Sequence, residues 1–134
     1  MDSVCLPFGI LPGQNPLFID FAHHFPRVRD FFNPPPLEDS AIEHRLDRAR
    51  RSYQIPRGPF SAALTAYNRT LCGSQLLDQH LEAFQSEDCV AVVTGQEVGL
   101  FGGPSFTVYK AATAIRLAAQ LREQGVQAVP VFWL

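Results

Sequence analysis

The fold of this chain is decided by the stretch Val92-Val93-Thr94-Gly95-Gln96-Glu97-Val98-Gly99-Leu100-Phe101-Gly102-Gly103-Pro104. A β-branched run stops at a glycine-rich loop, and an amphipathic helical pattern follows the loop. This order is typical of an anion-binding turn in an α/β protein. Four glycines within nine residues indicate a backbone that adopts positive φ values or closely approaches another group.

The residues on either side of the loop predict one βαβ unit over residues 89–134. The apolar run 89–93 is typical of a strand covered on both faces, and the run 129–134 predicts a second, parallel strand joined by a right-handed crossover. Pro104 suits the first turn of the helix between them, and Gly125 suits its end. The side chains expected to face the sheet are Val108, Ala111, Ala112, Ile115, Ala118 and Ala119, with Leu121 as a possible further member.

Short helices and an irregular arm precede this unit. The patterns predict helices over residues 38–53, 60–72 and 74–84, with Pro56, Gly58 and Pro59 ending the first. In the third helix, the side chains expected to face the interior are Leu76, Leu77 and Leu81. Residues 1–36 hold seven prolines, including Pro34-Pro35-Pro36, and are predicted to be an aromatic-rich arm that packs on a larger body. A short helix over residues 18–25 is compatible with this. The predicted division is therefore an arm, 1–36, and the start of an α/β core, 37–134.

Composition and charge exclude several classes of protein. Hydrophobic residues make up 46% of the chain and charged residues 18%, which suits a globular core. The net charge of −2 gives no reason to expect nucleic acid or an anionic membrane as a partner. No apolar run approaches the roughly 18 residues of a membrane span, and the first residues lack the basic segment of a signal peptide. Cys5, Cys72 and Cys89 are too scattered for a disulfide framework, so we predict a cytoplasmic protein.

The polar residues at the loop are the candidate ligand-binding groups. They follow the carboxyl end of a strand, where open α/β sheets bind ligands, and the start of the next helix adds backbone N–H donors. Lys110 lies roughly 9 Å along that helix, within reach of an anion at its start. The predicted substrate- or nucleotide-binding residues are Thr94, Gly95, Gln96, Gly99, Gly102, Gly103 and Lys110.

Two features limit this interpretation. The glycine spacing matches neither a P-loop nor the dinucleotide-binding fingerprint, so a loop shaped by packing alone, with Lys110 as a solvated lysine, is an open alternative. No catalytic residue is predicted, since no Ser-His-Asp arrangement can be argued from spacing. No metal site is predicted either, because the neighbours His23 and His24 point in different directions and there is no C-x-x-C or H-E-x-x-H pattern.

The segment VVTGQEVGLFGGPSFTVYKAATAIRLA, followed by VPVFWL, resembles the N-terminal region of BshC, the cysteine ligase of bacillithiol biosynthesis. The resemblance is carried by the TGQ-x-x-GLF-x-GP core, by Tyr109-Lys110 on the following helix and by a Pro-Val-Phe-Trp strand, and covers residues 90–134. The chain departs from the family at Glu97, where glutamine is usual, and at Ser105-Phe106, where Leu-Tyr is common. Glu97 is therefore left out of the predicted binding set.

The resemblance implies a Rossmann-like core related to class I aminoacyl-tRNA synthetases. It also implies a reaction that joins cysteine to the amine of glucosaminyl malate, with ATP activating the carboxylate. An acidic, histidine-containing motif of the family would come after Leu134, so the chain, which stops on a hydrophobic strand, is expected to be an inactive N-terminal fragment of a homodimeric enzyme. The other possibilities are a different nucleotide-binding α/β enzyme that shares the loop, and a non-catalytic truncated remnant.

Overall fold

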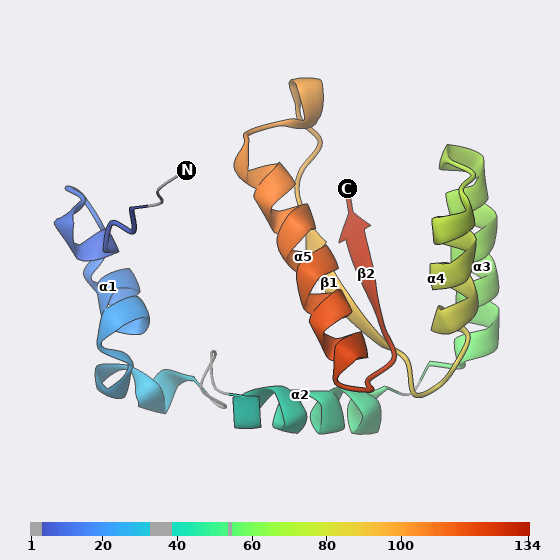
Figure 1. The fold of residues 1–134 in the computed structure, drawn as a ribbon, viewed down its shortest axis with the longest axis horizontal. Coiled ribbons are helices and arrows are strands. Elements are labelled where there is room, and N and C mark those ends of the chain that lie inside the picture. The colour runs from blue at the N-terminus through green and yellow to red at the C-terminus, as the bar shows by residue number, and fades with distance from the viewer. Residues whose placement is uncertain (1–3, 33–38, 54) are drawn as a thin grey trace. The chain divides into compact units, whose positions relative to one another are not determined.

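A computed structural model describes residues 4–32, 39–53 and 55–134 (Figure 1). The chain divides into two compact units, 1–47 and 48–134, and each is described by itself. The described helices and strands, apart from short 3₁₀ turns, are α1 (Pro16–His23), α2 (Asp39–Ser52), α3 (Arg57–Leu71), α4 (Gln75–Phe84), β1 (Val90–Gly95), α5 (Phe106–Glu123) and β2 (Ala128–Trp133). The predicted boundary at 36/37 and the run Pro34-Pro35-Pro36 lie outside the described residues. No helix in the described part is long and apolar enough to cross a membrane.

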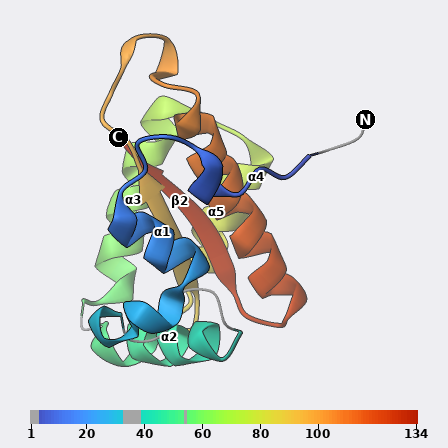
Figure 2. The ribbon, with the colours of Figure 1, turned by 90° about the vertical axis from the view of Figure 1, so that its left-hand side faces the viewer.

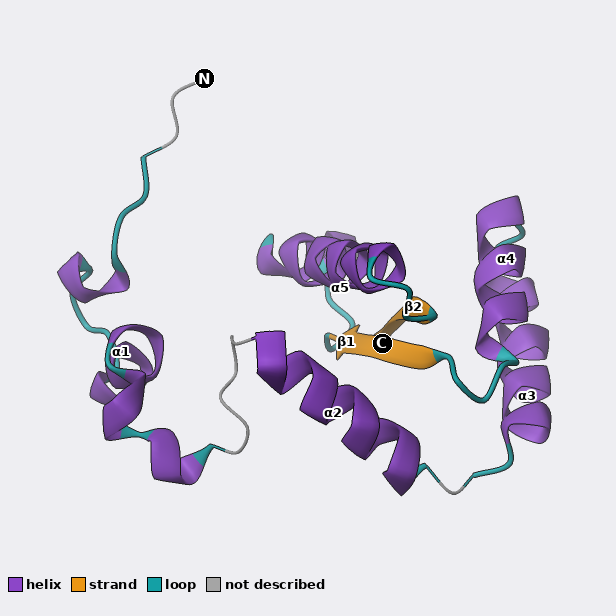
Figure 3. Ribbon diagram, turned by 60° about the horizontal axis from the view of Figure 1, so that its bottom comes forward, coloured by secondary structure: helices purple, strands orange, loops and turns teal. Residues whose placement is uncertain are grey.

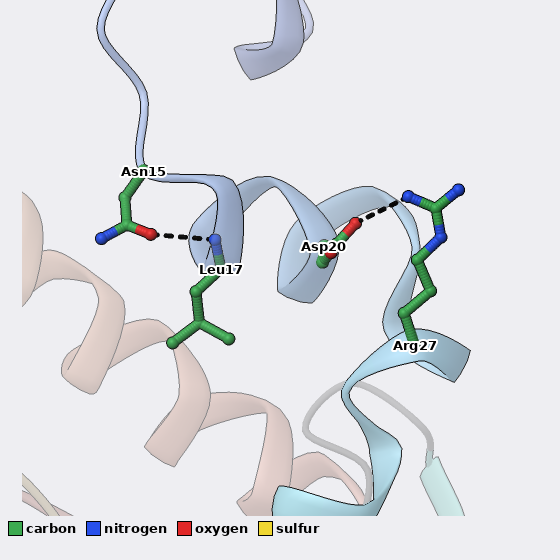
Figure 4. Close-up of polar contacts among 4 residues, drawn as sticks. All are labelled: Asn15, Leu17, Asp20 and Arg27. Atoms are coloured by element: carbon green, nitrogen blue, oxygen red, sulfur yellow. Dashed lines mark hydrogen bonds and ion pairs between the residues drawn. The ribbon is translucent and has the colours of Figure 1, made fainter.

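The first unit is built around α1, which begins two residues before the expected range. Asn15 caps it, because its Oδ1 accepts a hydrogen bond of 2.8 Å from the Leu17 N–H, and Pro16 occupies the first turn (Figure 4). After the helix, the Arg27 guanidinium pairs with the Asp20 carboxylate at 3.1 Å (Figure 4). The aromatic rings of this unit contact one another in the pairs Phe8–Phe18, Phe21–Phe25, Phe21–Phe32 and Phe25–Phe32.

The helix α3 shows one error of the sequence-based prediction. It begins at Arg57 rather than at residue 60, so Gly58 and Pro59 lie in its first turn instead of in a linker. Proline is tolerated there because the first N–H groups of a helix have no intrahelical partner. The next helix, α4, agrees with its expected range, and Ser74 caps it by accepting from the Leu77 N–H at 3.1 Å. Leu76, expected to point inward, is 61% exposed.

The βαβ unit is present as predicted. The strands β1 and β2 are parallel, and their register runs from Val90 opposite Ala128 to Gly95 opposite Trp133. Figure 3 shows α5 along one face of the two strands. The expectation that both faces of β1 are covered is wrong for this chain, because Val93 is 59% exposed.

The face of α5 that packs on the strands agrees only in part with the predicted one. Ala118 and Leu121, a possible member of that face, are buried, but so is Ala114, which was not expected, whereas Val108 and Ile115 are 71% and 57% exposed. Pro104 lies before the helix rather than in its first turn, and its carbonyl accepts from the Thr107 N–H at 2.9 Å. Figure 2 shows α5 running back alongside β2 before the turn that contains Gly125, whose φ of 82° confirms the predicted helix end.

Candidate functional site

The glycine-rich loop begins where the pairing of β1 with β2 ends. Gly95 is the last residue of β1, and the Gln96 N–H continues the ladder by donating to the Trp133 carbonyl at 3.2 Å. A side chain on Gly95 would displace the indole of Trp133, because an added Cβ would lie 2.5 Å from its Nε1. The indole thus covers the strand end, a contact that sequence reasoning missed.

The remaining glycines close the loop on itself. A Cβ on Gly99 would lie 2.8 Å from the Cα of Gly103, so the two backbones touch. Gly102 and Gly103 have φ values of 85° and 78°, which L-residues rarely adopt. Phe101, between them and Gly99, has a φ of 53° and is 99% exposed. Packing within the loop therefore accounts for Gly99, while a Cβ on Gly102 would meet open space.

Lys110 lies next to Gln96 at the end of β1. Its ammonium donates to Oε1 of Gln96 at 2.9 Å and to the carbonyl of Gly95 at 3.4 Å, and it lies 5.0 Å from the centroid of the Phe106 ring. A lysine can only donate, so this contact orients the amide with its oxygen toward Lys110 and its NH₂ group away from it. The pair holds a cation and two amide donors at the carboxyl end of the strand.

A shallow hollow of about 400 Å³ adjoins this pair, between β1 and the first turns of α5. Thr94 and Lys110 line it together with Tyr109 and Thr113. The structure therefore brings together Thr94, Gly95, Gln96 and Lys110, and places Gly99, Gly102 and Gly103 in the loop that follows.

The start of α5 contributes a further polar group. No side chain caps this helix, since Ser105 makes no capping hydrogen bond. Oγ1 of Thr107, in its first turn, is buried and has no hydrogen-bond partner among the described residues. A Cβ on Gly103 would lie 3.5 Å from that oxygen, so the hydroxyl lies directly beneath the loop. Thr107 was not predicted, and the only sequence signal for it is a threonine shortly after Gly-Gly-Pro.

This arrangement suits an anionic or carboxylate-bearing ligand. It combines an uncapped helix start, an ammonium group, amide donors and an unpaired hydroxyl, all at one end of a parallel strand. Among the described residues, no three His, Cys, Asp or Glu side chains come close enough to hold a metal ion.

Comparison with known proteins gives one family. The family model described as "Bacillithiol biosynthesis BshC, N-terminal Rossmann-like domain" matches residues 1–134. Relatives named "Putative cysteine ligase BshC" include a protein of Solibacter usitatus, 35% identical over 134 residues, which are 100% of this chain and 24% of the relative. Another, from Koribacter versatilis, is 33% identical over 135 residues, covering 97% of the chain and 24% of the relative. A third, from Chlorobaculum tepidum, is 44% identical over 73 residues, covering 53% and 13%. The chain spans about a quarter of the length of the first two relatives.

Proposed function

Because this chain belongs to the family of BshC N-terminal Rossmann-like domains, we propose that it supplies part of the substrate site of an enzyme that ligates cysteine to glucosaminyl malate. The observation that carries the proposal is the contact between Lys110 and Gln96, which prepares amide donors beside a cation at the end of β1. A carboxylate is the group that cysteine offers to an amine, and it suits these donors.

The same site suits the phosphates of ATP. The uncapped start of α5 offers backbone N–H groups and a partial positive charge, Lys110 adds a full charge, and Thr107 offers a buried hydroxyl without a partner. ATP, when bound, would supply the leaving group that activates a carboxylate. The residues proposed to hold it are Gly102, Gly103, Thr107 and Lys110. We also propose that the whole enzyme is a homodimer.

Binding titrations of the whole protein test the substrate assignment. We expect cysteine, glucosaminyl malate and ATP each to bind, and the ligated product to form when all three are present. ATP binding without either small substrate would favour a different nucleotide-binding enzyme. No binding of any of the three would favour a non-catalytic remnant.

Two substitutions at Gln96 test the role of its amide. Gln96→Ala is expected to weaken substrate or transition-state binding by about 1–3 kcal/mol, the cost of leaving a buried partner unpaired. Gln96→Glu can still accept from Lys110 but loses the amide donors and repels a carboxylate, so it is expected to weaken binding at least as much. Gln120→Ala, at an exposed position of α5, is the matched control. Unchanged kcat and KM in both Gln96 variants would remove this residue from the site.

A further inference from the structure

A second hollow, of about 510 Å³, lies at the opposite end of β1 from the glycine loop. It falls entirely within the unit 48–134 and is formed by the end of α2, the start of α3, the end of α4 and the first residues of β1. Six of the residues that line it carry the argument, namely Arg50, Tyr53, Arg57, Phe60, Phe84 and Glu87. Cys89, at this end, lies six residues before Gly95, so roughly 20 Å of strand separates it from the start of the glycine loop.

Arg57 is a buried cation in the wall of this hollow. It is 9% exposed, and its guanidinium carbon lies 4.4 Å from the ring centroids of both Tyr53 and Phe84. One Nη donates to the Cys89 carbonyl at 3.0 Å, but Nε has no hydrogen-bond partner among the described residues. A buried charge is costly unless it is paired and its donors are used, and among the described residues one carbonyl and two rings, but no carboxylate, contact this guanidinium.

The start of α3 increases the positive potential at the same place. Arg57 is the first residue of this fifteen-residue helix, and Pro56 before it provides no side-chain cap. A cation at a helix N-terminus opposes the helix dipole, so the position is unfavourable unless an anion lies nearby. The Cys89 thiol does not supply the negative charge, because burial raises its pKa above the ordinary value.

The other lining residues indicate which kind of anion fits. Arg50 adds a second cation and Glu87 a single carboxylate, while Tyr53, Phe60 and Phe84 give aromatic walls. A doubly charged phosphate would have to lose its hydration against these walls and would lie near Glu87. A singly charged carboxylate attached to an apolar body meets both the cations and the rings.

We propose that this hollow binds a small apolar carboxylic acid, with its carboxylate on the Arg57 guanidinium at the start of α3 and its apolar part against the aromatic rings. The site is separate from the glycine loop and does not depend on the ligase assignment.

Titration of the whole protein with benzoate tests the proposal. Benzoate is compared with benzamide, its uncharged analogue, and with inorganic phosphate, all at constant ionic strength. Calorimetry gives the affinities, and the Nε–H resonance of Arg57 in protein labelled with ¹⁵N-arginine reports the position. We expect benzoate to bind and to shift this resonance, and benzamide to do neither.

Three variants separate the contact from general electrostatics. Arg57→Lys keeps the charge but removes the planar guanidinium donors, and we expect it to weaken benzoate binding about tenfold, as the loss of a charge-assisted hydrogen bond would. Arg50→Gln is expected to weaken binding about two- to fivefold, since an exposed charge contributes less. Arg116→Gln, which removes the same charge from an exposed position of α5, is the control and should bind benzoate as the wild type does.

Three results would overturn the proposal. They are equal binding of benzamide and benzoate, tighter binding of phosphate than of benzoate, and benzoate affinities in Arg57→Lys and Arg50→Gln that match the Arg116→Gln control. If Arg57→Lys fails to fold, two measurements still decide the question. One is the comparison of benzoate with benzamide in the wild type, and the other is the benzoate affinity of the Arg50→Gln variant.

Discussion

Replacing Gly95 with alanine tests how β1 ends at the proposed substrate site. A methyl group there would lie 2.5 Å from Nε1 of Trp133 and 2.7 Å from two ring carbons, Cδ1 and Cε2. Ordinary carbon contacts are about 3.5–4.0 Å, so the indole must move by about 1 Å or rotate away. Gly95 is not among the glycines with positive φ, so the effect arises from this contact and not from backbone strain.

The burial of the indole sets the size of the effect. Trp133 is 62% exposed, so more than a third of its surface is covered. For a tryptophan side chain of roughly 200 Å², at about 25 cal/mol per Å², losing all of that cover costs at most about 2 kcal/mol. We therefore expect Gly95→Ala to lower the free energy of unfolding by about 1–2 kcal/mol. The backbone carbonyl of Trp133 accepts from the Gln96 N–H, so if this strand end shifts with the indole, Gln96 moves too and substrate affinity should fall as well.

Chemical denaturation of the whole protein measures this effect. Gly73→Ala is the control, because a Cβ there meets nothing within 4 Å and the substitution changes the unfolded chain in the same way. In a Trp133→Ala background, Gly95→Ala should not lower the free energy of unfolding any further. A Gly95→Ala variant as stable as the Gly73→Ala control, or an equal loss in both backgrounds, would refute the assigned contact.

Four further predictions concern other parts of the chain. Gly102→Val should lower substrate affinity more than stability: the positive φ of Gly102 opposes a β-branched residue and so changes the shape of the loop, while the exposed position of the loop keeps the loss of stability small. Titration and denaturation side by side would show this, and unchanged affinity would count against a ligand-facing loop. Cys89 should react with iodoacetamide more slowly than the exposed Cys5 and Cys72, since burial hides the Cys89 thiol and raises its pKa. Equal labelling of the three cysteines in peptide maps would contradict this. Burial, and secondly the charge of Arg122, lowers the pKa of His80 below its ordinary 6.5, so the unfolded state takes up the proton first and the free energy of unfolding should fall as the pH drops below about 6.5. His80→Gln should flatten this part of the plot of stability against pH, and an unchanged slope would exclude His80 as the cause. Residues 1–134 alone should be poorly soluble or partly unfolded, because β1 and α5 expose apolar side chains; a sharp cooperative melt of a monomer would show the reverse.

The features that the sequence predicted correctly depend on neighbours along the chain. The β-branched run, the glycine loop and the helical pattern are local signals, and together they imply the βαβ unit that the structure shows. The helix end at Gly125 is also a local signal, because such an end is recognised from a few adjacent residues. The reach of Lys110 toward the start of its helix was predicted from a similar local argument, since a helix fixes the distance of each residue from its start, but its contact with Gln96 was not.

The packing face of α5 could not be read from the same pattern. Alanines occupy several faces of this helix, so the apolar period does not single out one of them, and the structure buries Ala114, Ala118 and Leu121 rather than Ile115. The reason that Gly95 is glycine was equally hidden. It depends on the register that places Trp133 opposite, which is a property of two strands and the crossover between them.

Arg57 shows the limit of local reasoning most clearly. From the sequence it stands between two prolines, in a segment that was interpreted as a linker, where an arginine is ordinarily solvated. Its role depends on Cys89, thirty-two positions later, whose carbonyl it binds, and on Phe84, whose ring it stacks against. Neither partner can be inferred from spacing, because both contacts require α3 and α4 to lie against the start of β1. A buried cation whose Nε lacks a partner is visible only once those elements are in place, and it is this unmet electrostatic requirement that makes a carboxylate in the hollow a testable expectation.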